Sequence, residues 1–253
     1  MIRPSVETIV KARYGQQEKV SVVGEDLAVS SGVFVVMMGL FAVSASSSST
    51  EMVLRQGETT NFEVFRPFGT DGVEYSLGFQ WGEDGTRRSS ELGEWVTNTK
   101  DEAEWEAHRI QRFDNPGEPV YAIITLNGRS CRYLTEPVSR LGEKLWRGLG
   151  TPADSGGHAF QFGSSACRLQ EKAGWNQGSI RIEQVSTALA GEHVKLEGSA
   201  PLNFKFTSGI VYDWLWPMYF WQLWVGILAL WGFALVLIRY CRRKRIKQTR
   251  PET

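Results

Sequence analysis

A run of 24 residues, from Leu215 to Ile238, contains no charged side chain and a single amide, at Gln222. In a helix, about 20 apolar residues are enough to cross the roughly 30 Å hydrocarbon core of a bilayer. A buried helix of a soluble protein usually contributes a shorter apolar run, of about 10–14 residues. We therefore predict a transmembrane helix over residues 214–238.

Aromatic side chains gather at the two ends of this run. Trp and Tyr favour the level of the lipid headgroups, where their rings meet apolar chains on one side and water on the other. Pro217 fits the same interpretation, because proline is tolerated in the first turn of a helix. We expect a membrane-interface belt that consists of Trp214, Trp216, Tyr219, Trp221, Trp224 and Tyr240.

The net charge of zero conceals a strong asymmetry. Residues 239–253 carry 7 basic residues and 1 acidic residue, whereas residues 46–213 carry 17 basic and 23 acidic residues. Basic residues next to a span remain in the cytoplasm, so we predict a cytoplasmic tail over 239–253 and an extracytoplasmic domain over 46–213. This explains the basic cluster without nucleic acid as a partner. The residues that set the topology are Arg239, Arg242, Arg243, Lys244, Arg245 and Lys247.

A second uncharged run covers residues 27–45. Its 19 residues meet the length of a span, which would place residues 1–26 in the cytoplasm. The alternative is a signal peptide that is cleaved after Ala45, where small residues resemble a processing site. We favour the uncleaved anchor, because the 26 residues before the run include acids, whereas a signal peptide begins with a short basic segment.

Small residues recur at helical spacing in both apolar runs. Such residues let helices approach closely in lipid. We expect the two helices to pack on each other or on a partner, with ordinary lipid-facing positions as the alternative. The candidate packing residues are Gly32, Gly39, Gly226, Ala229 and Gly232.

The chain has three cysteines, of which Cys131 and Cys167 fall in the predicted extracytoplasmic domain. An even pair in an oxidising compartment favours a disulfide, with two separate buried thiols as the alternative. Cys241 falls at the cytoplasmic edge of the membrane and has no predicted role.

The domain between the two runs is rich in alternating apolar and polar residues. In Gly72–Trp81 every second residue is apolar, which is typical of a strand with one buried face. The Asn127–Gly128 dipeptide predicts a hairpin turn, because both positions tolerate positive φ. Further strands are expected at 60–66, 120–126, 129–134, 159–162, 179–183, 193–197 and 203–207.

Two short helices are expected among the strands. Residues 99–102 (TKDE) match a capping box before a helical segment, and Leu141, Leu145 and Leu149 recur at four-residue spacing within 139–149. The resulting fold class is mainly β, an antiparallel sandwich or jelly roll between two transmembrane helices.

Motifs for chemistry are sparse. The sequence has no P-loop, no G-x-G-x-x-G, no H-E-x-x-H and no G-x-S-x-G, so we predict no catalytic residue, no cofactor and no metal site. His158 lies near Asp154 and Ser155, but Gly, Ser and Asp are also the usual residues of turns. Exposed tryptophans, including Trp95 and Trp146, are the residue type that stacks on sugar rings.

Three function hypotheses follow. The first is a non-catalytic interaction or assembly subunit in a bacterial-type inner membrane, with a periplasmic domain that binds another membrane or periplasmic protein, or a second copy of itself. The second is a ligand-sensing subunit, which would need a partner to pass its signal on, because segments of about 26 and 15 residues cannot hold an output domain. The third is an extracytoplasmic carbohydrate-binding or hydrolase module.

Overall fold

The structure is a computed structural model, and it describes residues 29, 31–95, 102–163, 166–204 and 210–248. The chain divides into two compact units. One unit is the domain Val43–Trp214, and the other comprises the segments on either side of it.

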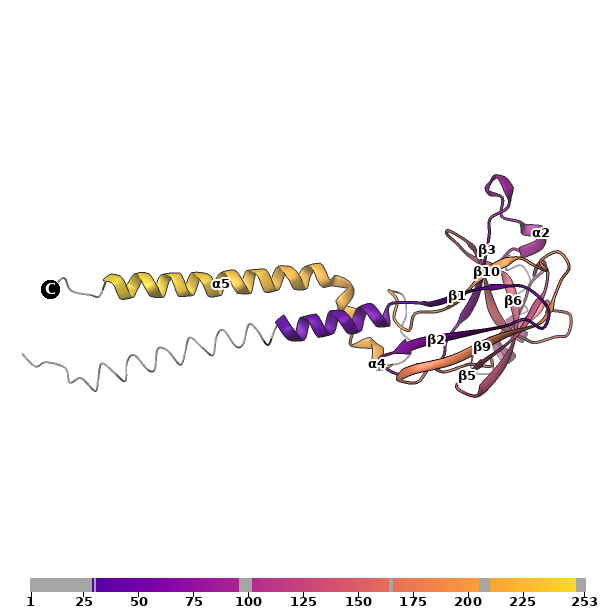
Figure 1. Cartoon of the computed structure of the whole chain (residues 1–253), viewed down its shortest axis with the longest axis horizontal. Helices are drawn as coiled ribbons and strands as arrows, with labels where there is room; N and C mark the ends of the chain where they lie inside the picture. Colours follow the sequence, from indigo (N-terminus) through magenta and orange to yellow (C-terminus); the bar gives the residue numbers. More distant parts are fainter. Residues whose placement is uncertain (1–28, 30, 96–101, 164–165, 205–209, 249–253) are drawn as a thin grey trace, which may run out of the picture. The chain divides into compact units, whose positions relative to one another are not determined.

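The domain consists mainly of antiparallel β-structure (Figure 1). Eight strands form one continuous path of hydrogen-bonded neighbours, in the order β1-β10-β3-β7-β6-β5-β9-β2. The two remaining strands, β4 and β8, pair with each other, and β8 also pairs with β7. The strands are β1 (Ser48–Val53), β2 (Thr59–Arg66), β3 (Tyr75–Phe79), β4 (Ile110–Arg112), β5 (Val120–Leu126), β6 (Arg129–Leu141), β7 (Leu145–Pro152), β8 (Ala159–Gln161), β9 (Gly174–Val185) and β10 (His193–Gly198).

The sheet curls so that its edge strands β1 and β2 approach each other, which makes the domain nearly barrel-shaped. The prediction of an antiparallel β-domain is therefore confirmed. The finer expectation of a sandwich or jelly roll is met only in part, since one curled sheet takes the place of two separate layers. The alternation of apolar residues is the same in both architectures and does not distinguish them.

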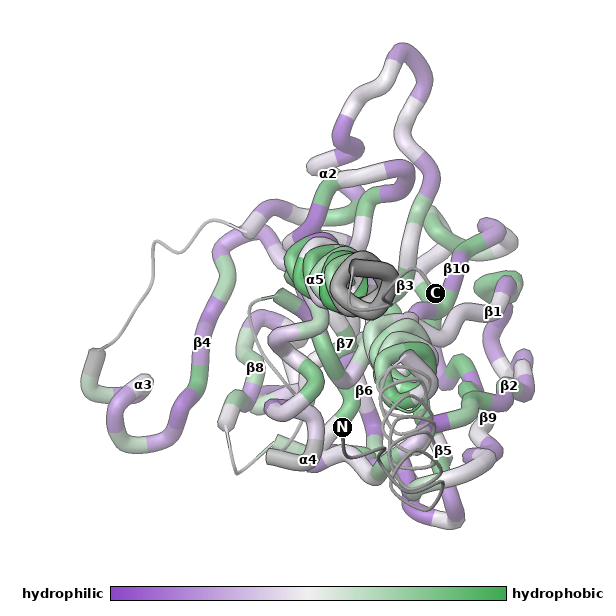
Figure 2. Tube along the Cα trace, turned by 90° about the vertical axis from the view of Figure 1, so that its left-hand side faces the viewer, coloured by the Kyte–Doolittle hydropathy of each residue, from purple (hydrophilic) through white to green (hydrophobic). Residues whose placement is uncertain are grey.

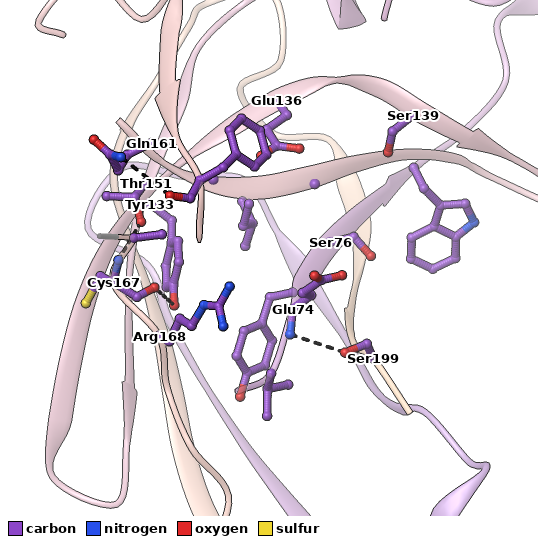
Figure 3. A pocket seen from close by; sticks show the side chains of 18 of the residues that line it. Glu74, Ser76, Tyr133, Glu136, Ser139, Thr151, Gln161, Cys167, Arg168 and Ser199 are labelled. Carbon is purple, nitrogen blue, oxygen red and sulfur yellow. Dashed lines mark hydrogen bonds between the residues drawn. The ribbon is translucent and has the colours of Figure 1, made fainter. Parts of the chain in front are cut away.

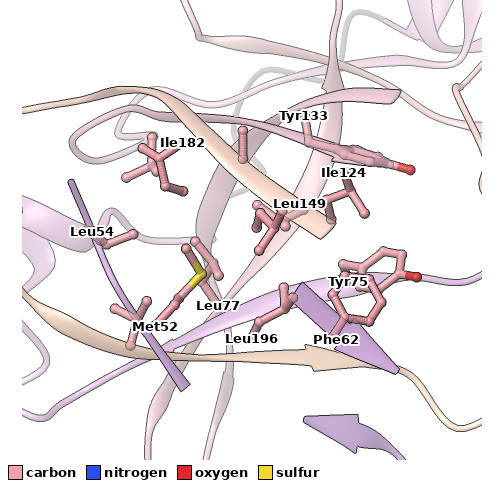
Figure 4. Packing of buried hydrophobic residues seen from close by; sticks show 14 of the residues in the cluster. Met52, Leu54, Phe62, Tyr75, Leu77, Ile124, Tyr133, Leu149, Ile182 and Leu196 are labelled. Carbon is pink, nitrogen blue, oxygen red and sulfur yellow. The ribbon is translucent and has the colours of Figure 1, made fainter. Parts of the chain in front are cut away.

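The interior of the curled sheet holds the main hydrophobic core. Strand β5 shows the underlying pattern, because its residues alternate strictly between buried and half-buried. The packed side chains come from all eight strands of the continuous path, and Figure 4 shows part of this cluster. Among those that are fully shielded from solvent are Leu54, Leu77, Phe79, Ile124, Leu145 and Ile182.

The hairpin between β5 and β6 confirms the prediction from Asn127–Gly128. Asn127 has a φ of 50° and Gly128 a φ of 83°, and the flanking residues Leu126 and Arg129 pair directly. Positive φ at both central positions gives the turn a twist that matches the strands. The disulfide is also confirmed, since Cys131 on β6 is bonded to Cys167 with their Cα atoms 5.8 Å apart.

One local prediction is wrong, and a second is tested only in part. Residues 139–149, expected to be helical, form the end of β6, a turn and most of β7. The regular leucine spacing is outweighed there by cross-strand pairing, which places Leu141 opposite Leu145. The strand expected at 203–207 is not seen at Asn203 and Phe204, and the rest of it lies outside the described residues.

Short helices lie between some of the strands and after the last one. The predicted helix after the capping box is present as α3 (Glu102–His108), although residues 99–101 themselves lie outside the described residues. The others are η1 (Glu83–Gly85), α2 (Ser89–Leu92), α4 (Ile210–Asp213) and η3 (Trp216–Phe220).

The second unit contains α5 (Trp221–Gln248), which is coloured as hydrophobic over much of its length in Figure 2. Together with η3 it provides a helical segment, Trp216–Ile238, whose mean hydropathy of 2.0 and length of 23 residues suffice to cross a membrane. No residue of its most apolar 18-residue stretch is buried within the protein, although Met218 near its start is buried. The described part of the other apolar helix, Ser31–Ser44, is shorter than a span requires, so a pair of flanking transmembrane helices is not confirmed.

Candidate functional site

A cavity of about 420 Å³ lies on the outer face of the curled sheet, against β3, β6 and β7. The alternation of the strands defines this face, because Leu77 and Leu149 point into the core while Ser76 and Gly148 point outward. Residues at and after the end of β8 complete the wall. Figure 3 shows Glu136 and Ser139 on β6, Glu74 and Ser76 at β3, and Arg168 close to Tyr133.

Glu136 is the most unusual residue of this cavity, because its side chain is a buried carboxyl. It lies where the β6–β7 ladder shifts register, between Thr135 and Val138. Pro137 follows it and has no N–H to contribute to a ladder, which favours a bulge at this point. A bulge re-aims the side chains next to it. The alternation of β6 breaks here, so that residues 133–137 are all buried.

Two glycines of β7 make room for the Glu136 carboxyl. A Cβ at Gly148 would lie 2.5 Å from Glu136 Oε2, and a Cβ at Gly150 would collide with Glu136 Oε1. The same Cβ at Gly150 would also lie 2.7 Å from a ring carbon of Phe160. The carboxyl therefore lies directly over the backbone of β7, at the floor of the cavity.

The buried guanidinium of Arg147 forms no ion pair with this carboxyl. The fully buried Arg147 donates hydrogen bonds to the main-chain oxygens of Glu136, Glu118, Pro116 and Thr135, at 2.7–3.3 Å. Its guanidinium therefore directs its N–H groups to main-chain oxygens and not to the Glu136 carboxyl. Among the described residues, the Glu136 carboxyl has no hydrogen-bond or ion-pair partner.

Burial has a large effect on the ionisation of Glu136. Only 9% of the residue is exposed, and desolvation raises the pKa of its carboxyl to about 7. The negative charge of Glu74 raises this pKa further, and the positive charge of Arg147 lowers it. The carboxyl can therefore carry either charge state near neutral pH, depending on what occupies the cavity.

Aromatic side chains form much of the cavity wall. They include Trp95, Tyr133, Trp146 and Phe162. The Trp146 ring already carries one cation, since the Arg140 guanidinium lies 4.5 Å from its centroid. Arg140 is also paired with Glu197 at 2.8 Å. This rim pair is largely neutral as a unit, so the charges left over are those of Glu136, Glu74 and the exposed Arg168.

The residues predicted for the membrane interface lie at the start and end of the apolar helical segment. Trp214, Trp216, Trp221, Trp224 and Tyr240 are exposed, and Tyr219 is half-buried against Phe41. The Trp224 indole N–H bonds to the carbonyl of Pro217. The structure does not place any of them in the cavity, and their role at a membrane stays a prediction.

The predicted topology and packing residues also lie outside the domain. Helix α5 continues to Gln248 and so includes Arg239, Arg242, Arg243, Lys244, Arg245 and Lys247. A Cβ at Gly32, Gly39, Gly226 or Gly232 would find open space, and Ala229 is exposed. These small residues make no close helix contact within the described structure, so their proposed packing remains untested.

His158 and Asp154, the pair that suggested a triad, take part in a turn. Asp154 accepts hydrogen bonds from the backbone N–H groups of Gly157 and His158, at 2.8 and 3.2 Å. The His158 ring lies 3.4 Å from the carbonyl of Phe113. Within the described residues, no group of three or more His, Cys, Asp or Glu side chains is arranged to hold a metal ion.

Sequence reasoning missed the cavity and its central carboxyl. The available signals were the Glu136–Pro137 pair and the two glycines that alternate with Leu149. Each signal points to a cavity only when β6 is paired with β7. The helix predicted over residues 139–149 excludes this pairing. The structure brings Trp95 and Trp146 to the same cavity, but of these two tryptophans expected to be exposed only Trp95 is, since Trp146 is buried.

No family model matches the chain, and no curated protein matches it either. Among solved structures, the chain is similar to a protein of Sulfurospirillum deleyianum, with 14% identity and a TM-score of 0.39. That similarity covers 62% of this chain and 99% of the other.

Proposed function

We propose that this protein is a non-catalytic, membrane-anchored binding subunit whose β-domain lies outside the cytoplasm. The observation that carries the proposal is the Trp216–Ile238 segment, which is long enough to cross a bilayer and whose most apolar 18-residue stretch has no buried residue. A free apolar helix of that length is costly in water, whereas lipid accommodates it.

The chemistry on the two sides of this segment supports one orientation. The basic residues from Arg239 to Lys247 would remain in the cytoplasm. The Cys131–Cys167 disulfide suits an oxidising compartment on the opposite side, as in a bacterial periplasm. The short helix Ser31–Ser44 would be part of a second anchor or of a signal sequence.

The cavity around Glu136 is the proposed binding site of the domain. It is concave, it has aromatic walls and it contains a buried carboxyl without a partner among the described residues. These are features of recognition sites. The proposed partner is a membrane or periplasmic protein, and the small residues of the apolar helices would let its own spans pack closely.

Site-specific photo-cross-linking in native membranes tests this proposal. A benzophenone side chain replaces the exposed Ser139 at the cavity rim, and a matched variant carries it at the exposed Gln177 on β9. We expect a discrete protein adduct from position 139 and none from position 177. An adduct of twice the chain mass would identify the partner as a second copy. Cross-links to lipid alone, or to the same proteins from both positions, would overturn the proposal.

A second candidate function is carbohydrate binding. Trp95 and Trp146 line the same cavity as Glu136, and tryptophan rings beside a carboxyl are a common way to hold sugars. This candidate, like a ligand-sensing role, requires a small-molecule ligand. Saturable binding of neutral oligosaccharides that is lost in Trp146→Ala would favour it over the interaction subunit.

A further inference from the structure

We propose that the Glu136 cavity binds an organic cation, an ammonium or guanidinium group on an apolar stem. In the assembled membrane, the source of this cation would be a basic side chain of the partner protein. The cation chemistry goes beyond the proposed function and does not depend on it, whereas the source of the cation rests on it.

The first argument is the missing countercharge. A buried carboxylate is costly unless a cation or hydrogen-bond donors compensate it. Arg147, the buried cation of the same strand pair, directs its donors to four main-chain oxygens. The Glu136 carboxyl has no partner among the described residues, although it is only 9% exposed. A ligand that brings its own positive charge would supply what the fold leaves out.

The second argument is the shape of the floor. Gly148 and Gly150 present bare backbone on both sides of the carboxyl, and any side chain there would collide with Glu136. The glycines thus keep a 420 Å³ space open in front of the carboxyl. That volume is at the lower end of small-molecule sites, which are about 300–1,000 Å³, and it accepts a side chain with ease.

The third argument is the chemistry of the walls. Aromatic faces attract cations through their quadrupoles and also pack against apolar stems. Arg140 stacks on Trp146 at 4.5 Å, which shows that this ring accepts a guanidinium. Trp95 lines the cavity as well, and it is 37% exposed.

The charged groups around Glu136 agree with a cationic ligand. Glu74, next to β3, adds a second negative charge, and Arg147 on β7 is engaged with the backbone. Glu197 on β10 is paired with Arg140 on β6, so neither leaves a charge uncompensated. Arg168 is exposed and packs its stem over Gly72, and among the described residues it forms no ion pair with Glu136. The carboxylates that remain outnumber this single cation.

Titration of the full chain in lipid nanodiscs tests the cation chemistry directly. The probes are n-butylammonium, n-butylguanidinium and, as a neutral control of similar size, n-butanol. We expect both cations to bind at pH 8 and n-butanol to bind at least tenfold more weakly. In Glu136→Gln the affinity for the cations should fall at least tenfold. In Glu51→Gln, at an exposed position on β1 that does not line the cavity, it should change less than threefold. Equal binding of n-butanol, or unchanged binding in Glu136→Gln, would overturn the proposal.

A competition experiment identifies the source of the cation. Saturating n-butylammonium is added to membranes during cross-linking from position 139. Loss of the protein adduct would support a basic side chain of the partner as the natural occupant. An unchanged adduct would overturn that source and assign the cavity to a free amine. If the cations bind but position 139 gives no protein adduct, the proposed function fails while the cation chemistry stands.

Discussion

The Arg66 guanidinium at the end of β2 pairs with the Glu171 carboxyl at 2.5 Å, and both side chains are shielded from solvent. Arg66 also donates to the carbonyl oxygens of Ser46 and Ser199. Ser46 lies just before β1, and Ser199 directly follows β10. This one side chain therefore connects the start of the β-domain, the end of β2, the approach to β9 and the exit from β10.

Replacement of Arg66 by methionine should destabilise the domain strongly. The variant leaves Glu171 buried without its cation, and breaking a buried pair in this way costs about 3–5 kcal/mol. The matched control is Arg132→Met, since Arg132 pairs with Glu183 in a largely exposed position, where a pair contributes about 0–1 kcal/mol. Chemical denaturation of the full chain in detergent measures the free energy of unfolding of both variants. Equal losses in the two variants would show that the Arg66 pair is not a structural cross-link.

Removal of the disulfide should also lower stability. Cys131 and Cys167 are separated by 36 residues, and a closed loop of this length stabilises by roughly 3–4 kcal/mol in the chain-entropy model. The double variant Cys131→Ser, Cys167→Ser should unfold at a correspondingly lower denaturant concentration. The control Cys241→Ser should behave like the parent chain, because Cys241 is a free, exposed cysteine.

Glu136 should make the stability of the domain fall as pH rises from about 4.5 to about 7. Its pKa in the folded protein is about 7, compared with 4.5 for an ordinary glutamate, so the folded state binds more protons in this interval. The stability that protonated Glu136 contributes is complete below pH 4.5 and is lost by about pH 7.

Denaturation of Glu136→Gln at two pH values isolates this contribution. Relative to the parent chain, the variant should be more stable at pH 8 by up to about 3 kcal/mol, with little difference at pH 4. Other titrating groups contribute equally to the stability of both proteins, so their effects cancel in the difference. One such group is Glu171, whose pKa is also raised by burial. The same stability difference at both pH values would contradict a buried, titrating Glu136.

Gly150→Ala should destabilise the domain, because the new methyl group meets both Glu136 and Phe160. Overpacking of this kind typically costs about 1–3 kcal/mol. The control is Gly142→Ala in the turn between β6 and β7, where the added Cβ would have open space. A thermal melt compares the two. If the two variants have the same melting temperature, the added methyl group at position 150 does not collide with Glu136 and Phe160.

The antiparallel strands and the disulfide are predictable because their signals are local or compositional. The alternation that predicts β5 and β9 is visible within ten residues, and Asn127–Gly128 specifies its turn through its own φ angles. The leucines at 141, 145 and 149 gave a misleading helical period. Two of them face each other across a hairpin, and this pairing is decided by tertiary contacts.

The cavity is harder to predict, because it depends on contacts between segments that are distant in sequence. Glu136 reads as an ordinary strand carboxylate until β7 places Gly148 and Gly150 beneath it and β8 brings Phe160 beside it. The buried role of Arg66 is hidden for the same reason, since its partner Glu171 is 105 residues away. The surroundings of Glu136 and Arg66 form only when the sheet closes, and the local sequence pattern does not predict that closure.

Thiol labelling tests the proposed topology most directly. Intact cells and inverted membrane vesicles are treated with a membrane-impermeant maleimide, and the mass of the full chain is then measured with and without prior reduction. With the β-domain outside and the basic tail inside, Cys241 should be labelled only in inverted vesicles, and Cys131 and Cys167 only in intact cells after reduction. Labelling of Cys241 from outside, or of unreduced Cys131 and Cys167 in inverted vesicles, would contradict the anchored extracytoplasmic domain.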